Sequence, residues 1–163
     1  MAKECMKNNQ NIYFHARKNA ALYDKNLNSR EKTAELIGIS VSALSDYELG
    51  ITKVVPPENV DIMAKLYNCP ELRTKYCKEQ CPLGKHIEVA TSISNLEGIA
   101  LRMVNEFDID RIRELIKNIV AVAADGVITS DEKLTVKNIL VQLDKISLAI
   151  SEMKLIGEKA LNK

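Results

Sequence analysis

The segment from Arg30 to Gly50, REKTAELIGISVSALSDYELG, constrains the fold of this 163-residue chain more than any other stretch. Two helix-forming stretches, 30–37 and 41–49, are separated there by a very short connection. Gly38 tolerates the positive φ that ends a helix in a tight turn, and Ser40 can cap the N–H groups that begin the second helix. The segment therefore predicts two short helices that cross at a steep angle.

Two helices that cross at a tight turn need a small residue where their backbones approach and apolar residues that face inward from both. Ala34 provides the small residue in the first helix. The apolar residues expected to face inward are Leu36, Ile37, Ile39 and Leu44.

The rest of the N-terminal half has the signals of helices joined by short loops. Further helices are expected at 11–19, 58–67 and 70–80, with a loop at 20–28. Pro56 and Pro57 open one of these helices, because proline fits the first helical turn. The run Pro82-Leu83-Gly84 then breaks the chain, so we expect one domain at 1–85 and a second at 86–163.

Apolar residues recur three and four positions apart throughout the C-terminal half, which is the spacing of amphipathic helices that pack along a seam. The stretches with this spacing are 89–107, 109–123 and 136–160. Breaks fall at Asp108 and at 125–130, and we expect Ser130 to cap the last helix. The sequence thus predicts an all-α chain, in which a five-helix N-terminal domain precedes a three-helix, antiparallel and coiled-coil-like module.

The last predicted helix carries a second apolar row beside its seam, made of Leu140, Leu148, Leu155 and Ile156. One seam is enough to pack a helix against its own chain, so the second row indicates a partner surface. We expect a homodimer or a higher homo-oligomer held together by residues 87–161. The alternative is that the three helices bury both rows within one chain.

The charge is unevenly divided between the two halves. Residues 1–86 contain 13 Lys and Arg against 10 Asp and Glu, whereas residues 87–163 contain 10 against 12. A half that binds nucleic acid would be the positive one. No stretch approaches the roughly 18 uninterrupted apolar residues that span a membrane, and the N-terminus lacks the apolar core of a secretion signal. We therefore expect a cytoplasmic protein with no membrane association and with reduced cysteines.

The segment 12–67 resembles the lambda-repressor-like, Cro-type helix-turn-helix family, also called the XRE family. The resemblance is carried by Ala34, the turn Gly38-Ile39-Ser40, Leu44, the ending Tyr47-Glu48-Leu49-Gly50, and the Pro-Pro-Glu entry into a helix that contains Met63-Ala64-Lys65-Leu66-Tyr67. It implies a dimeric transcriptional regulator whose partner is double-stranded DNA. A small helical bundle that uses the same packing without touching DNA remains the alternative.

By this resemblance, helix 41–49 is the recognition helix that enters the major groove. Its outward residues, expected to contact DNA, are Val41, Ser42, Ser45 and Asp46. Ser42 can bond several base edges, Val41 can touch a thymine methyl group, and Asp46 can accept a hydrogen bond from cytosine. The helix has no Arg, Lys, Asn or Gln, and Asp46 repels phosphate. Affinity must therefore come from the flanks of the helix.

Two basic residues flank the recognition helix. Arg30, at the start of the preceding helix, is expected either to grip phosphate or to clamp the recognition helix. Lys53 is expected to face the DNA backbone, although a solvated surface charge is an equally good interpretation of this lysine. The family also implies a structural ion pair between Arg17, late in the first helix, and Glu48.

Cysteines gather near the predicted domain boundary. Cys77 and Cys81 share a helix face, and Cys69 and His86 flank them. These four residues have the chemistry of a Cys₃His zinc site, but their spacing is not that of a standard finger or ribbon. We expect packed thiols and no metal or cofactor. A zinc site and a redox switch between Cys77 and Cys81 are the alternatives.

Catalytic motifs are missing from the sequence. The chain has two histidines, neither in a catalytic context, and no phosphate-binding loop or dinucleotide fingerprint. Residues 125–132 lack the ligand order of a calcium loop and are interpreted as a capped turn between helices. We therefore predict a sequence-specific, double-stranded-DNA-binding transcriptional regulator and not an enzyme. The alternative is a protein-interaction adaptor built on a helix-turn-helix fold that does not bind DNA.

Overall fold

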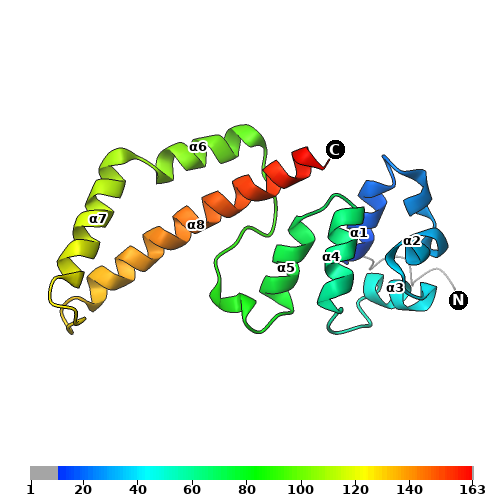
Figure 1. Cartoon of the computed structure of the whole chain (residues 1–163), viewed down its shortest axis with the longest axis horizontal. Coiled ribbons are helices and arrows are strands. Elements are labelled where there is room, and N and C mark those ends of the chain that lie inside the picture. Colours follow the sequence, from blue (N-terminus) through cyan, green and yellow to red (C-terminus); the bar gives the residue numbers. More distant parts are fainter. Residues whose placement is uncertain (1–10, 163) are drawn as a thin grey trace, which may run out of the picture. The chain divides into compact units, whose positions relative to one another are not determined.

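The computed structural model describes residues 11–162, and within this range every regular element is a helix (Figure 1). The chain forms two compact units. The first comprises the chain up to His86 together with the segment from Glu158 onward, and the second comprises Ile87–Gly157. The sequence-based division did not anticipate that the end of the chain belongs with the N-terminal unit.

The first unit contains five α-helices and two short 3₁₀ helices. They are α1 (Ile12–Ala20), η1 (Lys25–Asn28), α2 (Arg30–Ile37), α3 (Val41–Glu48), α4 (Pro57–Leu66), α5 (Glu71–Glu79) and η2 (Gly84–His86). Three of the α-helices begin with a side chain that accepts a hydrogen bond from a free backbone N–H group, as caps do. These caps are Asn11 for α1, Ser29 for α2 and Ser40 for α3. The 3₁₀ helix η1 lies within segment 20–28, which the sequence predicts as a loop.

A single apolar core holds the first unit together. Its most enclosed members are Leu27, Ala34, Leu44, Val55, Val60, Met63, Ala64 and Leu72. The prediction that Leu36 faces this core is wrong, because its side chain is 55 % exposed while its neighbour Ile37 is buried. One residue along a helix turns the side chain by about 100°, and this turn places Leu36 outside the face of α2 on which Thr33, Ala34 and Ile37 are buried. Ile39 is partly buried and packs against the core as expected.

The last turn of α8 (Lys133–Leu161) also belongs to the first unit. Arg73 donates a hydrogen bond from Nη2 to Glu158 over 2.7 Å. The ammonium group of Lys159 lies 3.1 Å from a carboxylate oxygen of Glu71, and its backbone carbonyl accepts a hydrogen bond from Asn68. These polar contacts join the last turn to the region where α4 passes into α5.

The second unit is built from α6 (Leu96–Glu106), α7 (Ile109–Ala123) and most of α8. The prediction of a helix from residue 89 is wrong, since Asn95 caps a helix that begins at Leu96. The preceding segment bonds across the unit instead. The N–H groups of Ala90 and Ser94 donate to side chains of α8. In a helix that began at residue 89, the N–H of Ser94 would instead donate to the carbonyl of Ala90.

The start of α8 also differs from the prediction. The helix begins at Lys133, and Ser130 does not cap it. Glu132 precedes the first helical residue and accepts hydrogen bonds from both the backbone N–H and the hydroxyl of Thr129. The carboxylate of Asp125 accepts from the N–H of Val127, so the connection from α7 is a turn held by side chains. No helix of the described residues is long and apolar enough to cross a membrane.

Candidate nucleic-acid interface

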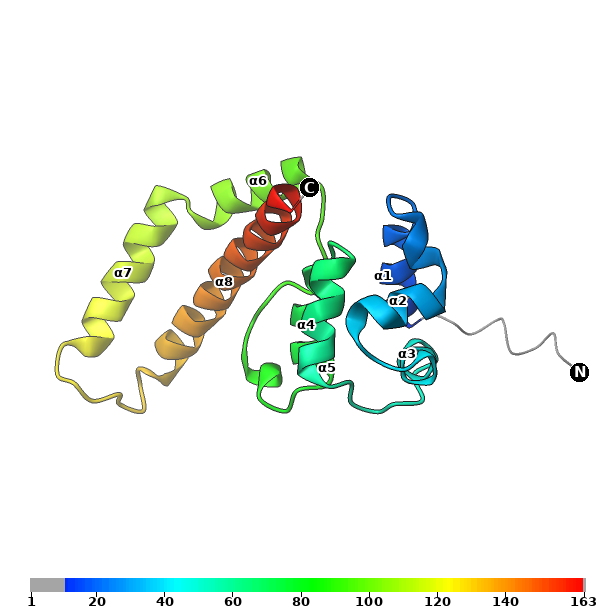
Figure 2. The ribbon, with the colours of Figure 1, turned by 45° about the vertical axis from the view of Figure 1, so that its right-hand side comes forward.

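The turn between α2 and α3 has the geometry that the sequence predicts (Figure 2). Gly38 adopts φ 82° and ψ 30°, a left-handed conformation that a side chain would strain. Its N–H and that of Ile39 both donate to the carbonyl of Ala34, over 2.9 and 3.0 Å. Ala34 is buried beneath the turn. These features fix the angle at which α3 leaves α2.

The C-terminal end of α3 is held by a buried carboxylate. Glu48 is fully enclosed, and its two oxygens accept hydrogen bonds from Nε and Nη2 of Arg17. Arg30 of α2 donates from Nε to the same carboxylate over 2.7 Å. One carboxylate thus receives two guanidinium groups from two other helices. A buried charge held this tightly leaves α3 little freedom to tilt.

Arg17 has a second set of partners in η1. Its Nη1 donates to the carbonyl oxygens of Leu27 and Asn28, over 2.9 and 3.0 Å. Backbone carbonyls of this kind give no signal in a sequence, so these contacts were not predicted. They anchor the long α1–α2 connection to the same side chain that pairs with Glu48.

Helix α4 supports α3 from another side. The side-chain amide of Asn59 donates to the hydroxyl of Tyr47 over 3.1 Å. Tyr67, at the end of α4, is buried, and burial together with the negative charge of Glu48 raises the pKa of its hydroxyl. The hydroxyl of Tyr67 therefore remains protonated, and its side chain packs in the core, whereas Tyr47 links α3 to α4 through its hydrogen bond.

The predicted contact residues of α3 differ in exposure. Val41 and Ser42, in the first turn of the helix, are exposed, whereas Ser45 and Asp46 are half-buried. The backbone carbonyl of Asp46 accepts a hydrogen bond from Ile51 over 2.9 Å, which closes the turn after the helix. The first turn of α3 is thus its most accessible part.

The two basic flanking residues also differ. Lys53 is exposed in the loop after α3. Arg30 is half-buried and bonded to Glu48, so it clamps α3 through one edge of its guanidinium group. The sequence predicts either a phosphate contact or a clamp on the recognition helix for Arg30. The structure contains the ion pair with Glu48 that the clamp requires.

Apolar side chains around the end of α3 were not singled out from the sequence. Leu49, Ile51 and Val54 are 43, 64 and 56 % exposed. Their spacing follows neither the helical nor the strand period, so no pattern distinguished them from core residues. These three residues form an exposed apolar margin at the C-terminal end of α3.

The cysteines do not assemble a metal centre in the described part of the chain. No group of three or more His, Cys, Asp or Glu residues lies there in a metal-binding arrangement. Cys69, Cys77 and Cys81 are free thiols, with Cys77 exposed and the other two half-buried. His86, the fourth residue of the zinc alternative, is exposed, and Cys5 lies outside the described residues.

The fold of α2, the Gly38 turn and α3, steadied by the Glu48 network, defines a helix-turn-helix domain. A family model for helix-turn-helix domains matches residues 21–72. This segment is a helix-turn-helix domain of the lambda-repressor-like, Cro type. Comparison with curated proteins and with solved structures gave no match.

Proposed function

We propose that this chain is a sequence-specific transcriptional regulator that binds double-stranded DNA as a dimer and has no catalytic activity. The observation that carries the proposal is the first turn of α3. Val41 and Ser42 are exposed there, while the other end of the helix is fixed through Glu48. A helix held at one end with an accessible N-terminal turn suits insertion into the major groove.

The proposed docking divides recognition between α3 and its flanks. Ser42 and Val41 touch base edges, and Ser45 and Asp46 border the contact. Lys53 and the exposed part of Arg30 contact phosphates. Because Asp46 is the only charged residue on the outward side of α3, base readout is modest and backbone contacts supply most of the affinity.

The second unit supports dimerisation through its exposed apolar residues. On α7, Ile116 and Val120 are 55 and 63 % exposed, and Leu140 on α8 is 56 % exposed. The buried apolar residues of the unit are few, namely Ala90, Ile99, Leu115, Ile139, Ala149 and Leu155. A helical module that leaves this many apolar side chains in water gains stability by burying them against a partner.

A second copy of the same chain is the partner that we propose for this unit. Two copies in a two-fold arrangement present identical apolar rows to each other, so each α7 and α8 gains the layer that it lacks. Seam-like spacing along α8 suits coiled-coil-like packing between the copies. The dimer would also set two helix-turn-helix domains on two half-sites of DNA, which raises affinity for palindromic sequences.

The DNA-binding part is tested by gel shift. Full-length protein is incubated with the DNA upstream of its own gene and with a pool of random duplexes. We expect a retained complex on specific sequences, weakened as salt rises. Lys53→Ala should weaken binding, and Lys137→Ala, which removes an exposed charge from the second unit, should not. Absence of binding to every duplex at low salt would contradict the proposal.

The dimer is tested by light scattering on the full chain. Truncation is unsuitable, because the end of α8 completes the first unit. The double variant Ile116→Lys, Val120→Lys should convert a dimer to a monomer, because charge on both exposed positions opposes burial. Lys117→Ala, between them on α7, is the matched control. A monomeric wild-type chain at micromolar concentration would exclude the dimer.

A protein-interaction adaptor is the second candidate. The lack of basic residues on α3, together with the apolar margin of Leu49, Ile51 and Val54, favours it. An adaptor would bind another protein through this margin. The gel shift separates the two candidates, since an adaptor retains no duplex even at low salt.

A further inference from the structure

A cavity in the first unit lies away from the proposed DNA contacts. It has a volume of about 730 Å³, within the range of pockets that hold small molecules. Its apolar lining comes from α1, η1 and the end of α4, through Ala16, Ala20, Leu22, Tyr23, Leu27, Leu66 and Tyr67. The polar lining residues are Asn19, Asp24, Asn68, Cys69, Glu71, Lys159 and Asn162. All of these residues belong to the first unit.

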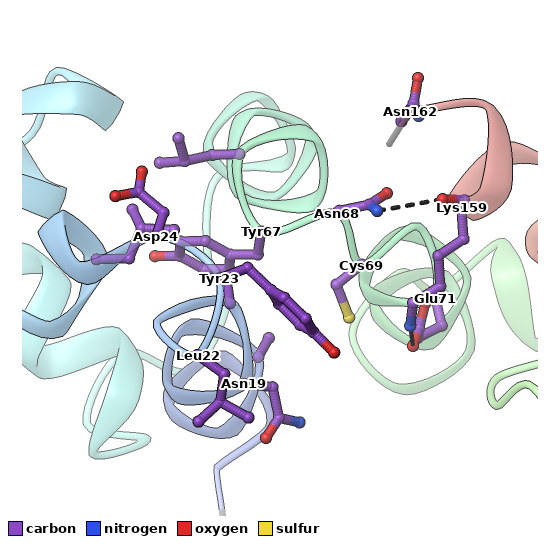
Figure 3. Close-up of a pocket in the computed structure, with 14 residues that line it drawn as sticks. Asn19, Leu22, Tyr23, Asp24, Tyr67, Asn68, Cys69, Glu71, Lys159 and Asn162 are labelled. Carbon is purple, nitrogen blue, oxygen red and sulfur yellow. Dashed lines mark hydrogen bonds and ion pairs between the residues drawn. The ribbon is translucent and has the colours of Figure 1, made fainter.

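Figure 3 shows the arrangement of the walls. Asn68, Cys69 and Glu71 lie on one side of the cavity, and Asn19, Leu22 and Tyr23 lie on the other. Leu22 and Tyr23 are 78 and 91 % exposed, although both are large and apolar. Two such neighbours at the rim of a cavity provide an apolar surface on which a ligand can lie.

Several buried side-chain oxygens in this wall have no hydrogen-bond partner. Among the described residues, the buried oxygen atoms without a hydrogen-bond partner are Tyr67 Oη, Asn68 Oδ1 and Glu71 Oε2. All three belong to residues that line the cavity. The Asn68 amide nitrogen bonds to the Lys159 carbonyl, and the Lys159 ammonium bonds to Glu71. The oxygens of Asn68 and Glu71 can only accept, so they offer two free acceptors to a ligand, and the Tyr67 hydroxyl can donate or accept.

The charges of the lining residues also favour a ligand that donates hydrogen bonds. Asp24 and Glu71 are acidic, and the single basic lining residue, Lys159, is paired with Glu71. Asp24 is exposed and uses its carboxylate to cap η1 at the N–H of Asn26, with acceptor capacity left over. The balance of charge favours a cation over an anion.

We propose that this cavity binds a small amphipathic amine, with its apolar or aromatic body against Leu22 and Tyr23. Its ammonium group donates hydrogen bonds to the free oxygens of Asn68 and Glu71. The end torsions of Asn and Glu side chains are broad, so small rotations turn their free oxygens towards the ligand. The exposed ring of Tyr23 adds a cation–π surface. This inference does not depend on whether the domain binds DNA.

The test is a titration of isotope-labelled, full-length protein followed by backbone amide chemical shifts. The probes are phenethylamine, phenethyl alcohol and hydrocinnamate, which share an aromatic body and differ in charge. We expect saturable shifts at Tyr23, Asn68 and Cys69 with the amine. The carboxylate probe should bind at least about fivefold more weakly, because the negative charge of Glu71 repels it.

Two variants locate the site. Tyr23→Ala should weaken amine binding, and Glu71→Gln should reduce the preference for the amine over the alcohol. Leu83→Ala is the matched control, because Leu83 is 76 % exposed in the same unit and does not line the cavity. The proposal is overturned if no probe gives saturable shifts, if hydrocinnamate binds as tightly as the amine, or if Tyr23→Ala and Leu83→Ala have equal effects.

Discussion

Arg17 on α1 contacts both carboxylate oxygens of Glu48 across 31 positions of the sequence. Both side chains are buried, and Arg30 shares the same carboxylate. We expect Glu48→Ala to lower the free energy of unfolding by about 3–5 kcal/mol, because it leaves the Arg17 guanidinium buried without a counter-charge. Urea unfolding followed by circular dichroism measures this change.

Two comparisons sharpen the Glu48 experiment. Glu35→Ala removes an exposed carboxylate from α2 and should change stability by less than about 0.5 kcal/mol. The double variant Arg17→Met, Glu48→Leu should recover part of the loss, since it leaves fewer buried charges unpaired. A Glu48→Ala protein as stable as the wild type would show that the buried pair does not hold the domain together.

The proposed DNA contacts separate into two kinds. Lys53→Ala should weaken binding to all sequences and flatten its salt dependence, because a phosphate contact is lost. Ser42→Ala and Asp46→Ala should instead change which duplexes are preferred in a selection from a random pool. Arg30→Ala should weaken binding and also destabilise the fold through Glu48. Unchanged affinity and preference in all four variants would refute this docking.

Acid should weaken the second unit through Glu152. Burial alone would raise the pKa of this carboxyl, but hydrogen bonds from Ser94 and the charge of Arg102 outweigh it and lower the pKa. A lowered pKa in the folded state means that the carboxylate stabilises the fold above the ordinary value of 4.5. That contribution is lost as the pH falls through the lowered pKa.

The matching experiment compares thermal unfolding of the wild type and Glu152→Gln across pH. The variant should be less stable at neutral pH, where it lacks the ionised partner of Arg102. The difference should shrink to zero in acid, when the wild-type carboxyl is also neutral. Glu97→Gln, at an exposed glutamate of α6, is the control. A constant difference at every pH would assign the effect of Glu152 to packing.

Cys69 should resist alkylation. Burial raises the pKa of its thiol to about 12, and the negative charge of Glu71 adds to the effect. Because the thiolate is the reactive form, iodoacetamide should modify Cys69 at least about a hundredfold more slowly than the exposed Cys77. Peptide mass spectrometry measures both rates in one sample. In urea, where the protein is unfolded, the two thiols should react at equal rates. Equal rates in the folded protein would contradict the burial of Cys69.

Local signals in the sequence were sufficient for much of the first unit. Ser29, Gly38 and Ser40 determine where α2 and α3 begin and end, because capping and positive φ depend on a few neighbouring residues. The pair of Arg17 and Glu48 came from the family resemblance. The partners of Arg17 in η1 were missed, since any residue can present a backbone carbonyl.

Non-local effects account for the errors. Apolar spacing predicted a helix from residue 89, but Ser94 bonds to Glu152 in α8, 58 positions away, and the helix begins only at Leu96. The cavity was likewise invisible, because its walls combine α1, the α4–α5 junction and the end of α8. The spacing of apolar residues indicates which face of a helix is buried, but it does not indicate which segment of the chain packs against that face.

The position of Glu158 and Lys159 bears on how the chain is made. Residues that contact Arg73 and Glu71 are separated from them by more than 80 positions. During synthesis the ribosome releases α1–α5 long before these residues, at about 5–20 residues per second. Helices α1–α5 are therefore synthesised several seconds before Glu158 and Lys159 can contact them. A nascent chain stalled before Glu158 should be more sensitive to protease than the same unit in the released protein.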